Sequence, residues 1–145
     1  MPWIETKREA ALHWWLGKLD QPYIWAGNEV ADGGFDCSGL INGALRKFEI
    51  TDRDLRARDL AEMFPEVHPN SIQPGDLLFW QRGDHIGHVE AVYAVFAGKI
   101  WTIGAAGGGS STKSVEAAKA RDARVKIHRA ADNWVRAVDP FGKHS

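Results

Sequence analysis

The stretch around the single cysteine is the feature that most constrains how this chain can fold. Cys37 follows an acidic residue, Asp36, and precedes apolar residues at helical spacing. These are Leu40, Ile41, Ala44, Leu45 and Phe48. Asp36 has a side chain suited to capping a helix, so we expect a buried helix over residues 37–48 with the cysteine in its first turn. The apolar face of that helix must then be covered by the rest of the domain.

Two other segments in the first half of the chain have helical patterns. Residues 5–19 carry apolar side chains at helical spacing with charges opposite, which predicts a surface helix. Residues 51–64 carry many charges and predict a short exposed helix, capped near Thr51 or Asp52. The charged part of this segment is most simply a solvated face, but it could also line one side of a cleft.

The second half of the chain is dominated by strand patterns. We expect strands at residues 77–80, 88–96, 100–103, 125–129 and 134–138, with loops at residues 66–73, 81–87 and 104–111. Residues 115–122 have no clear period. Helices followed by antiparallel strands are the pattern of an α+β fold. With 145 residues and neither repeat nor linker, we expect one domain over residues 1–145.

Composition gives no argument for nucleic acid or a membrane as a partner. The 18 basic residues nearly balance the 19 acidic ones, so no strong field favours nucleic acid or an anionic membrane. No apolar run approaches the ~20 residues that span a bilayer. The first residues lack an apolar signal core, so we expect no export by a classical signal peptide. We expect a monomer that neither binds nucleic acid nor inserts into a membrane.

Cys37 and His88 are the candidates for chemistry. A helix N-terminus favours a thiolate, and its free N–H groups can bind the oxyanion that forms when a thiolate attacks an amide. His88 begins a predicted strand and could supply the base, because such partners meet in space rather than in sequence. The alternatives are a buried inert thiol and a structural histidine.

The sequence contains no convincing pattern for a metal site or a nucleotide site. Potential zinc ligands cluster at Asp84, His85, His88 and Glu90, but no second cluster accompanies them. The glycine-rich residues 104–111 lack the lysine of a phosphate loop, because Ser110 stands at its place. We therefore expect no metal and no cofactor.

Four short blocks follow one another in an ordered pattern. They are Tyr23-Ile24-Trp25-Ala26-Gly27, Phe35-Asp36-Cys37-Ser38-Gly39-Leu40, Pro74-Gly75-Asp76-Leu77-Leu78-Phe79-Trp80 and Gly87-His88-Val89. In this order they resemble the signature blocks of the NlpC/P60 family of cysteine peptidases. The blocks span residues 23–89, and the chain is compatible with the family as far as residue 111. The resemblance implies a papain-like α+β domain whose cysteine-bearing helix packs on a five- or six-stranded antiparallel sheet.

The resemblance also implies a function, the hydrolysis of an amide bond in the stem peptide of peptidoglycan, often the bond after γ-D-glutamate. Cys37 matches the family's nucleophile and His88 its general base. Tyr23 matches a tyrosine that helps to orient the nucleophile or binds the oxyanion. Asp36 and Ser38 match positions that, in some relatives, hold the free N-terminal L-Ala of a trimmed stem.

One position departs from the family pattern. Relatives usually have a third polar residue, commonly His, on the strand after the histidine strand, where it orients the imidazole. Gly104 stands at that place in this chain. Thr102 shares its face and Glu90 lies two residues past His88, so either could substitute, as could a backbone carbonyl or water. Such an orienting group mainly fixes the tautomer, so its loss would lower the rate more than abolish it.

Other readings remain open at this point. Related papain-like folds include amidases, acyltransferases and deamidases, and the missing third residue also admits a non-catalytic wall-binding or phage structural module. Without a signal peptide or a wall-binding repeat, we expect a protein made in the cytoplasm that reaches the wall through a holin, a phage tail or a secretion machine. A phage endolysin ranks first among these origins.

Overall fold

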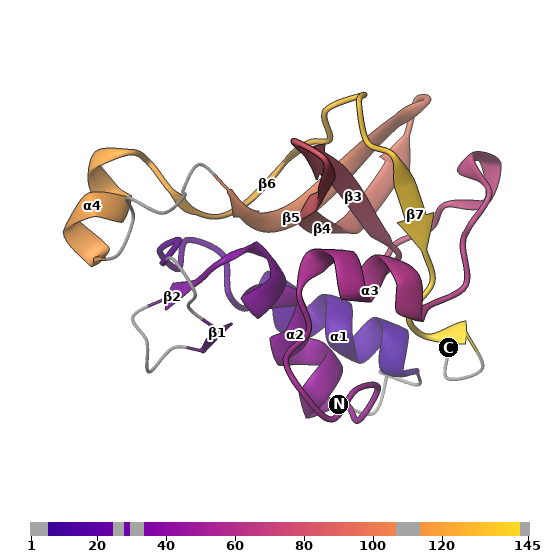
Figure 1. Cartoon of the computed structure of the whole chain (residues 1–145), viewed down its shortest axis with the longest axis horizontal. Coiled ribbons are helices and arrows are strands. Elements are labelled where there is room, and N and C mark those ends of the chain that lie inside the picture. Colours follow the sequence, from indigo (N-terminus) through magenta and orange to yellow (C-terminus); the bar gives the residue numbers. More distant parts are fainter. Residues whose placement is uncertain (1–5, 25–27, 30–33, 107–113, 143–145) are drawn as a thin grey trace.

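The protein consists of a twisted antiparallel sheet lying on a layer of helices (Figure 1). The computed structural model describes residues 6–24, 28–29, 34–106 and 114–142. The sheet contains β3 (Leu77–Arg82), β4 (His85–Phe96), β5 (Lys99–Ala106), β6 (Arg124–Arg129) and β7 (Arg136–Val138), in the order β6-β5-β4-β3-β7. This arrangement confirms the predicted α+β fold with an antiparallel sheet.

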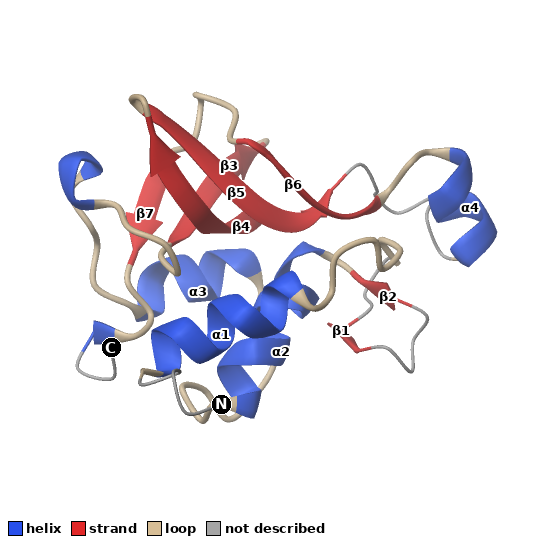
Figure 2. Ribbon diagram, turned by 180° about the vertical axis from the view of Figure 1, so that it is seen from behind, coloured by secondary structure: helices blue, strands red, loops and turns tan. Residues whose placement is uncertain are grey.

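Three helices cover one face of the sheet (Figure 2). They are α1 (Lys7–Leu16), α2 (Cys37–Lys47) and α3 (Ala57–Met63). The short pair β1 (Asn28–Glu29) and β2 (Gly34–Phe35) precedes α2, and α4 (Val115–Ala120) stands apart between β5 and β6. Within these described elements, no helix has the length and hydropathy needed to cross a bilayer.

The sheet separates two apolar clusters, which explains why the strand pattern at residues 77–80 is apolar throughout. Leu77 and Phe79 enter the cluster under the helices, whereas Leu78 and Trp80 enter a cluster on the other face. The apolar stripe of α2 is fully buried in the helix-side cluster, at Leu40, Ile41, Ala44 and Leu45. Burial of this stripe against the sheet sets the position of the cysteine at the start of α2.

The helix predicted over residues 51–64 begins only at Ala57, so the predicted caps at Thr51 and Asp52 are wrong. The physical reason is a side chain on α2. Asn42 accepts a hydrogen bond from the Leu55 N–H at 3.1 Å and donates to the Leu55 carbonyl at 2.7 Å. These bonds hold Leu55 beside α2, and Arg56, with an extended backbone, precedes the first turn of α3.

Other element bounds also differ from prediction. The loop predicted at residues 81–87 is a tight hairpin turn at Gly83 and Asp84, where Gly83 adopts a positive φ of 66°. Strand β5 continues to Ala106, so the loop predicted from Gly104 starts later, and residues 107–111 lie outside the described part. The patternless residues 115–122 contain α4, and α1 is three residues shorter at its C-terminal end than predicted.

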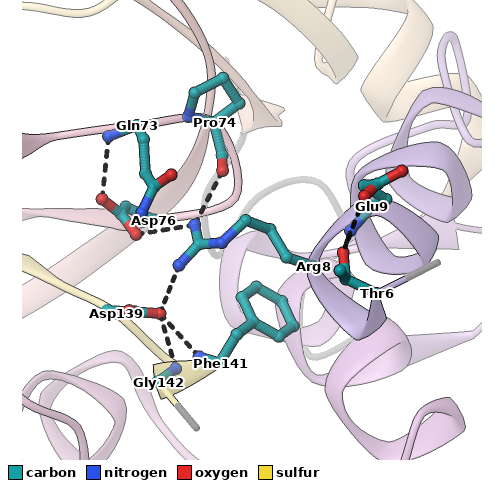
Figure 3. A network of polar contacts seen from close by, with 9 residues as sticks. All are labelled: Thr6, Arg8, Glu9, Gln73, Pro74, Asp76, Asp139, Phe141 and Gly142. Atoms are coloured by element: carbon teal, nitrogen blue, oxygen red, sulfur yellow. Dashed lines mark hydrogen bonds and ion pairs between the residues drawn. The ribbon is translucent and has the colours of Figure 1, made fainter. Parts of the chain in front are cut away.

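A buried ion network ties α1 to the sheet and to the C-terminal segment (Figure 3). Arg8 donates to Asp76 at 2.9 Å, to Asp139 at 2.6 Å and to the Pro74 carbonyl at 2.8 Å. Asp76 is almost fully buried and also accepts from the Gln73 N–H. The network therefore links three segments that are far apart in the sequence.

The network also explains the Pro-Gly-Asp block before β3. Gly75 adopts a φ of 95°, and a Cβ there would meet Arg8 Cγ at 2.8 Å. Glycine is thus required both by the backbone conformation and by the close approach of the arginine. Asp76 supplies the carboxylate that the buried guanidinium needs.

Replacing Arg8 with Met is expected to lower the free energy of unfolding by about 3–5 kcal/mol, because it leaves the carboxylate of Asp76 buried without its cation. The control is Arg46→Met, which removes an arginine from the exposed pair with Asp54 and should change it by less than about 1 kcal/mol. Urea unfolding monitored by tryptophan fluorescence measures both. Equal losses in the two variants would contradict a structural role for the network.

Candidate active site

Cys37 is the first residue of α2, at the helix N-terminus that the sequence predicts. The Asp36 carboxylate caps this helix by accepting a hydrogen bond from the Gly39 N–H at 2.6 Å. The last turn carries Arg46 and Lys47, so the charges at both ends of the helix match its dipole. The thiol therefore lies beside free backbone N–H groups and partial positive charge.

A cleft of about 630 Å³ opens at Cys37. Its lining brings together Tyr23, Asp36 and Ser38, which lie near the cysteine as the resemblance to the family implies. The opposite wall comes from the start of β4, and Cys37 Sγ lies 4.0 Å from the carbonyl oxygen of Gly87. The cysteine thus lies beside the first residues of β4, the strand that carries His88.

His88 lies between the thiol and a carboxylate. Its Nε2 is 2.7 Å from Glu90 Oε2, which leaves Nδ1 as the ring nitrogen for Cys37. Burial lowers the pKa of the imidazole, but hydrogen bonds to Cys37 and Glu90 outweigh this and raise the pKa from 6.5 to about 9. The imidazolium is therefore the favoured form at neutral pH, and it can stabilise a thiolate at Cys37.

Glu90 is an almost fully buried carboxylate with a partner on each oxygen. Oε2 contacts His88, while Oε1 accepts a hydrogen bond from the Thr102 hydroxyl and lies 2.8 Å from His128 Nε2. Burial raises the pKa of Glu90, but the hydrogen bonds with His128 and His88 outweigh it and lower the pKa to about 2. The carboxylate is ionised throughout the working range of an enzyme.

Gly104 provides the space that Glu90 occupies. A Cβ at position 104 would meet Glu90 Cγ at 2.6 Å, so no other residue fits there without displacing the glutamate. Among the candidates for the third residue, Glu90 contacts His88, and Thr102 contacts Glu90. The group beside the histidine thus comes from β4 itself rather than from the next strand.

A second hollow, of about 300 Å³, lies where the outer residues of this cluster meet the surface. His88, Glu90 and His128 line it together with Trp80, whose ring centroid is 5.5 Å from that of His88. Arg82 also lines it. The histidine is therefore packed between an indole and a carboxylate, which restricts its rotation.

Tyr23 lies close to the Cys37 thiol and the Asp36 carboxylate. Burial, followed by the charges of Cys37 and Asp36, raises the pKa of the phenol above its usual value of 10. The hydroxyl therefore stays protonated and remains a hydrogen-bond donor, as an oxyanion partner must.

Sequence reasoning missed His128, and it allowed that the charged residues 51–58 could line a cleft without naming Arg56 or Arg58. Arg56 and Arg58 line the cleft beside Cys37, because the bonds between Asn42 and Leu55 hold their segment there. The charged run of residues 51–58 gave only a hint of this. His128 carried no signal at all, because its contact with Glu90 depends on the pairing of β5 with β6. In the described part of the chain, no group of three or more His, Cys, Asp or Glu side chains is arranged to hold a metal ion.

Comparison with known proteins gives consistent results. The NlpC/P60 family profile matches residues 20–129. A curated relative, the probable endopeptidase YafL of Escherichia coli, is 37% identical over 89 residues, which cover 54% of this chain and 34% of YafL. This chain therefore matches about a third of the length of that relative.

Solved structures share the fold at lower identity. A lipoprotein-like NLP/P60 protein of Staphylococcus aureus superposes with a TM-score of 0.70 at 19% identity, covering 92% of this chain and 41% of the other. RipD of Mycobacterium tuberculosis superposes with a TM-score of 0.64 at 17% identity, covering 92% and 97% of the two chains. RipD is described as a non-catalytic NlpC/P60 domain protein adapted to peptidoglycan binding.

Proposed function

This chain belongs to the NlpC/P60 family, and from that membership we propose that it is a cysteine peptidase that hydrolyses an amide bond in the stem peptide of peptidoglycan. The observation that carries the proposal is the line of contacts from the thiol of Cys37 through His88 to the buried carboxylate of Glu90. A protein that only bound the cell wall would not need an ionised carboxylate buried behind a histidine.

The first half of the reaction forms an acyl-enzyme. The Cys37 thiolate attacks the carbonyl carbon of the scissile amide, and a C–S bond forms as the carbonyl oxygen takes the negative charge. The backbone N–H of Cys37 and the hydroxyl of Tyr23 are the donors proposed for this oxyanion. The tetrahedral intermediate then collapses, the C–N bond breaks, and His88 gives its Nδ1 proton to the leaving amine.

The second half releases the acyl group. Neutral His88 takes a proton from water, and the resulting hydroxide attacks the thioester carbonyl. The C–S bond breaks and the thiolate returns beside the reprotonated imidazole. Glu90 stays ionised through both halves and stabilises the imidazolium each time it forms.

The charges of the cleft support a stem peptide as substrate. Stem peptides carry free carboxylates, including the α-carboxylate of γ-linked D-glutamate, and two guanidinium groups, Arg56 and Arg58, line the cleft. Asp36 lines the same cleft and could receive a free amino terminus, although its carboxylate already caps α2. We propose cleavage after γ-D-glutamate on this basis.

Digestion of purified peptidoglycan is the experiment that tests the function. We expect wild-type protein to release fragments with new amino ends within the stem peptide, identified by mass spectrometry, and no new reducing sugar ends. Heat-unfolded protein is the control. Intact peptidoglycan after incubation with folded protein whose Cys37 alkylates normally would contradict a peptidase and favour a binding role like that described for RipD. The predicted phage origin and route to the wall find no support among the relatives and stay predictions.

A further inference from the structure

Glu90 contacts two histidines, His88 and His128, and the proposed mechanism gives His128 no role. It lies on β6, in register with Thr102 of β5, and its Nε2 is 2.8 Å from Glu90 Oε1. The imidazole is 38% exposed, whereas the carboxylate that it contacts is only 3% exposed. A partly exposed histidine therefore closes the outer side of a buried anion.

The two oxygens of Glu90 divide between two histidines. Oε2 is committed to His88, and Oε1 takes the bonds from Thr102 and His128. If Oε1 lost the histidine, the carboxylate would keep one short hydroxyl contact and could rotate toward the second hollow, where water can reach it. A rotated carboxylate would no longer face His88 Nε2 squarely.

We propose that His128 is a positioning residue for the reaction: by bonding Glu90 from β6, it holds the carboxylate in the orientation that aligns His88 with Cys37. The chain of contacts runs from the thiol on α2 to two histidines on β4 and β6 with one carboxylate between them. His128 touches neither the thiol nor the proposed path of the substrate, so it acts only through Glu90. This inference rests on the proposed thiol chemistry.

The ionisable groups that contact Glu90 come from β4 and β6. Glu90 faces His88 on its own strand and His128 on β6, with the neutral Thr102 on β5. Arg82, at the end of β3, is the remaining charged side chain that lines the second hollow. No charged group of the described helices takes part in the contacts of Glu90 given above. Of the two contacts on Glu90 Oε1, the one with His128 is therefore the contact that involves an ionisable group.

Alkylation of Cys37 by iodoacetamide as a function of pH tests the proposal without a substrate. In His128→Ala we expect alkylation at pH 7 to slow by about 10-fold, and the pH at half-maximal rate to rise, because a loosened Glu90 stabilises the imidazolium less. His128→Gln should recover most of the rate, since its amide nitrogen can donate from nearly the same place. His13→Ala, at an exposed position of α1, is the control and should match the wild type.

A double-mutant cycle shows whether His128 acts through Glu90. We expect Glu90→Gln/His128→Ala to react like Glu90→Gln alone, within about 2-fold, in both alkylation and kcat, with KM unchanged by His128→Ala. Wild-type behaviour of His128→Ala, or losses that multiply in the double variant, would overturn the proposal. If His128→Ala does not fold, His128→Leu, which cannot donate to Glu90, takes its place in the same cycle. Failure of wild-type protein to cleave peptidoglycan would instead overturn the proposed function, and the alkylation series would still judge His128.

Discussion

Replacing Cys37 with Ala is expected to abolish the release of peptide fragments from peptidoglycan. Loss of the nucleophile from a catalytic triad lowers kcat by on the order of 10⁶-fold, because the acyl-enzyme can no longer form. The fold should persist, since Cys37 is a small buried side chain whose truncation removes only the sulfur, with a cost of about 1 kcal/mol. Activity and stability should therefore separate cleanly in this variant.

The measurement is fragment release followed by mass spectrometry, beside thermal unfolding of the same preparations. Cys37→Ser is the matched variant, because its hydroxyl has nearly the shape of the thiol but is far harder to ionise. We expect it to be inactive as well, with an unchanged unfolding temperature. Cleavage that survives in either folded variant would show that the thiol is not the nucleophile.

Replacing Glu90 with Gln is expected to lower kcat by about 10²–10⁴-fold. The upper figure is the cost of the corresponding Asp to Asn change in a serine protease triad, where the amide favours the wrong tautomer of the histidine. Here the amide could donate to His88 Nε2 and so place the imidazole proton on Nδ1 without the charge that stabilises it. The imidazolium form of His88, which stabilises the thiolate, would then be less stable.

The pH dependence of the Glu90→Gln variant follows from the same contact. The wild-type pKa of His88 is raised to about 9, so steps that need the imidazolium proceed below that pH and fail as the pH rises through it. Removing the carboxylate removes part of what raises this pKa, so it should fall toward 6.5. The alkaline limb of kcat/KM against pH, which reports groups of the free enzyme, should therefore move to lower pH in the variant.

The control is Glu66→Gln, which neutralises an exposed glutamate paired with Arg136 on the surface. It should leave both kcat and the alkaline limb unchanged. An alkaline limb that stays in place in Glu90→Gln would mean that Glu90 does not set the protonation of His88. Unfolding temperatures of both variants separate this effect from a loss of structure.

The sequence was most informative where local chemistry alone decides the structure. The helix that begins at Cys37 could be predicted because Asp36 caps it and its apolar stripe has one period, and α2 ends within one residue of the expected position. The hairpin of β4 and β5 could be predicted from its strand residues and turn. The blocks that resemble the family predicted that Cys37 and His88 would meet, and the fold places them together, while their catalytic roles stay predictions.

The contacts that the sequence could not reveal depend on tertiary packing. The start of α3 is set by hydrogen bonds from Asn42, 13 residues away from Leu55, and no local pattern records them. Glu90 and His128 are separated by 38 residues and meet only because β5 lies between their strands. Glu90 could be named as one candidate among several, because it shares a face with His88, but its selection required the sheet register.

The close approach of Gly104 to Glu90 makes the two positions mutually exclusive. A side chain at position 104, where relatives usually carry their third polar residue, would occupy the volume of the glutamate, and the glutamate in turn forbids that side chain. Evolution between the two arrangements would therefore require paired substitutions, since either single change leaves a clash or an empty place behind the histidine. We therefore expect a glycine at this position of the strand after the histidine strand to occur together with a glutamate two residues after the histidine, and an alignment of relatives would check this pairing.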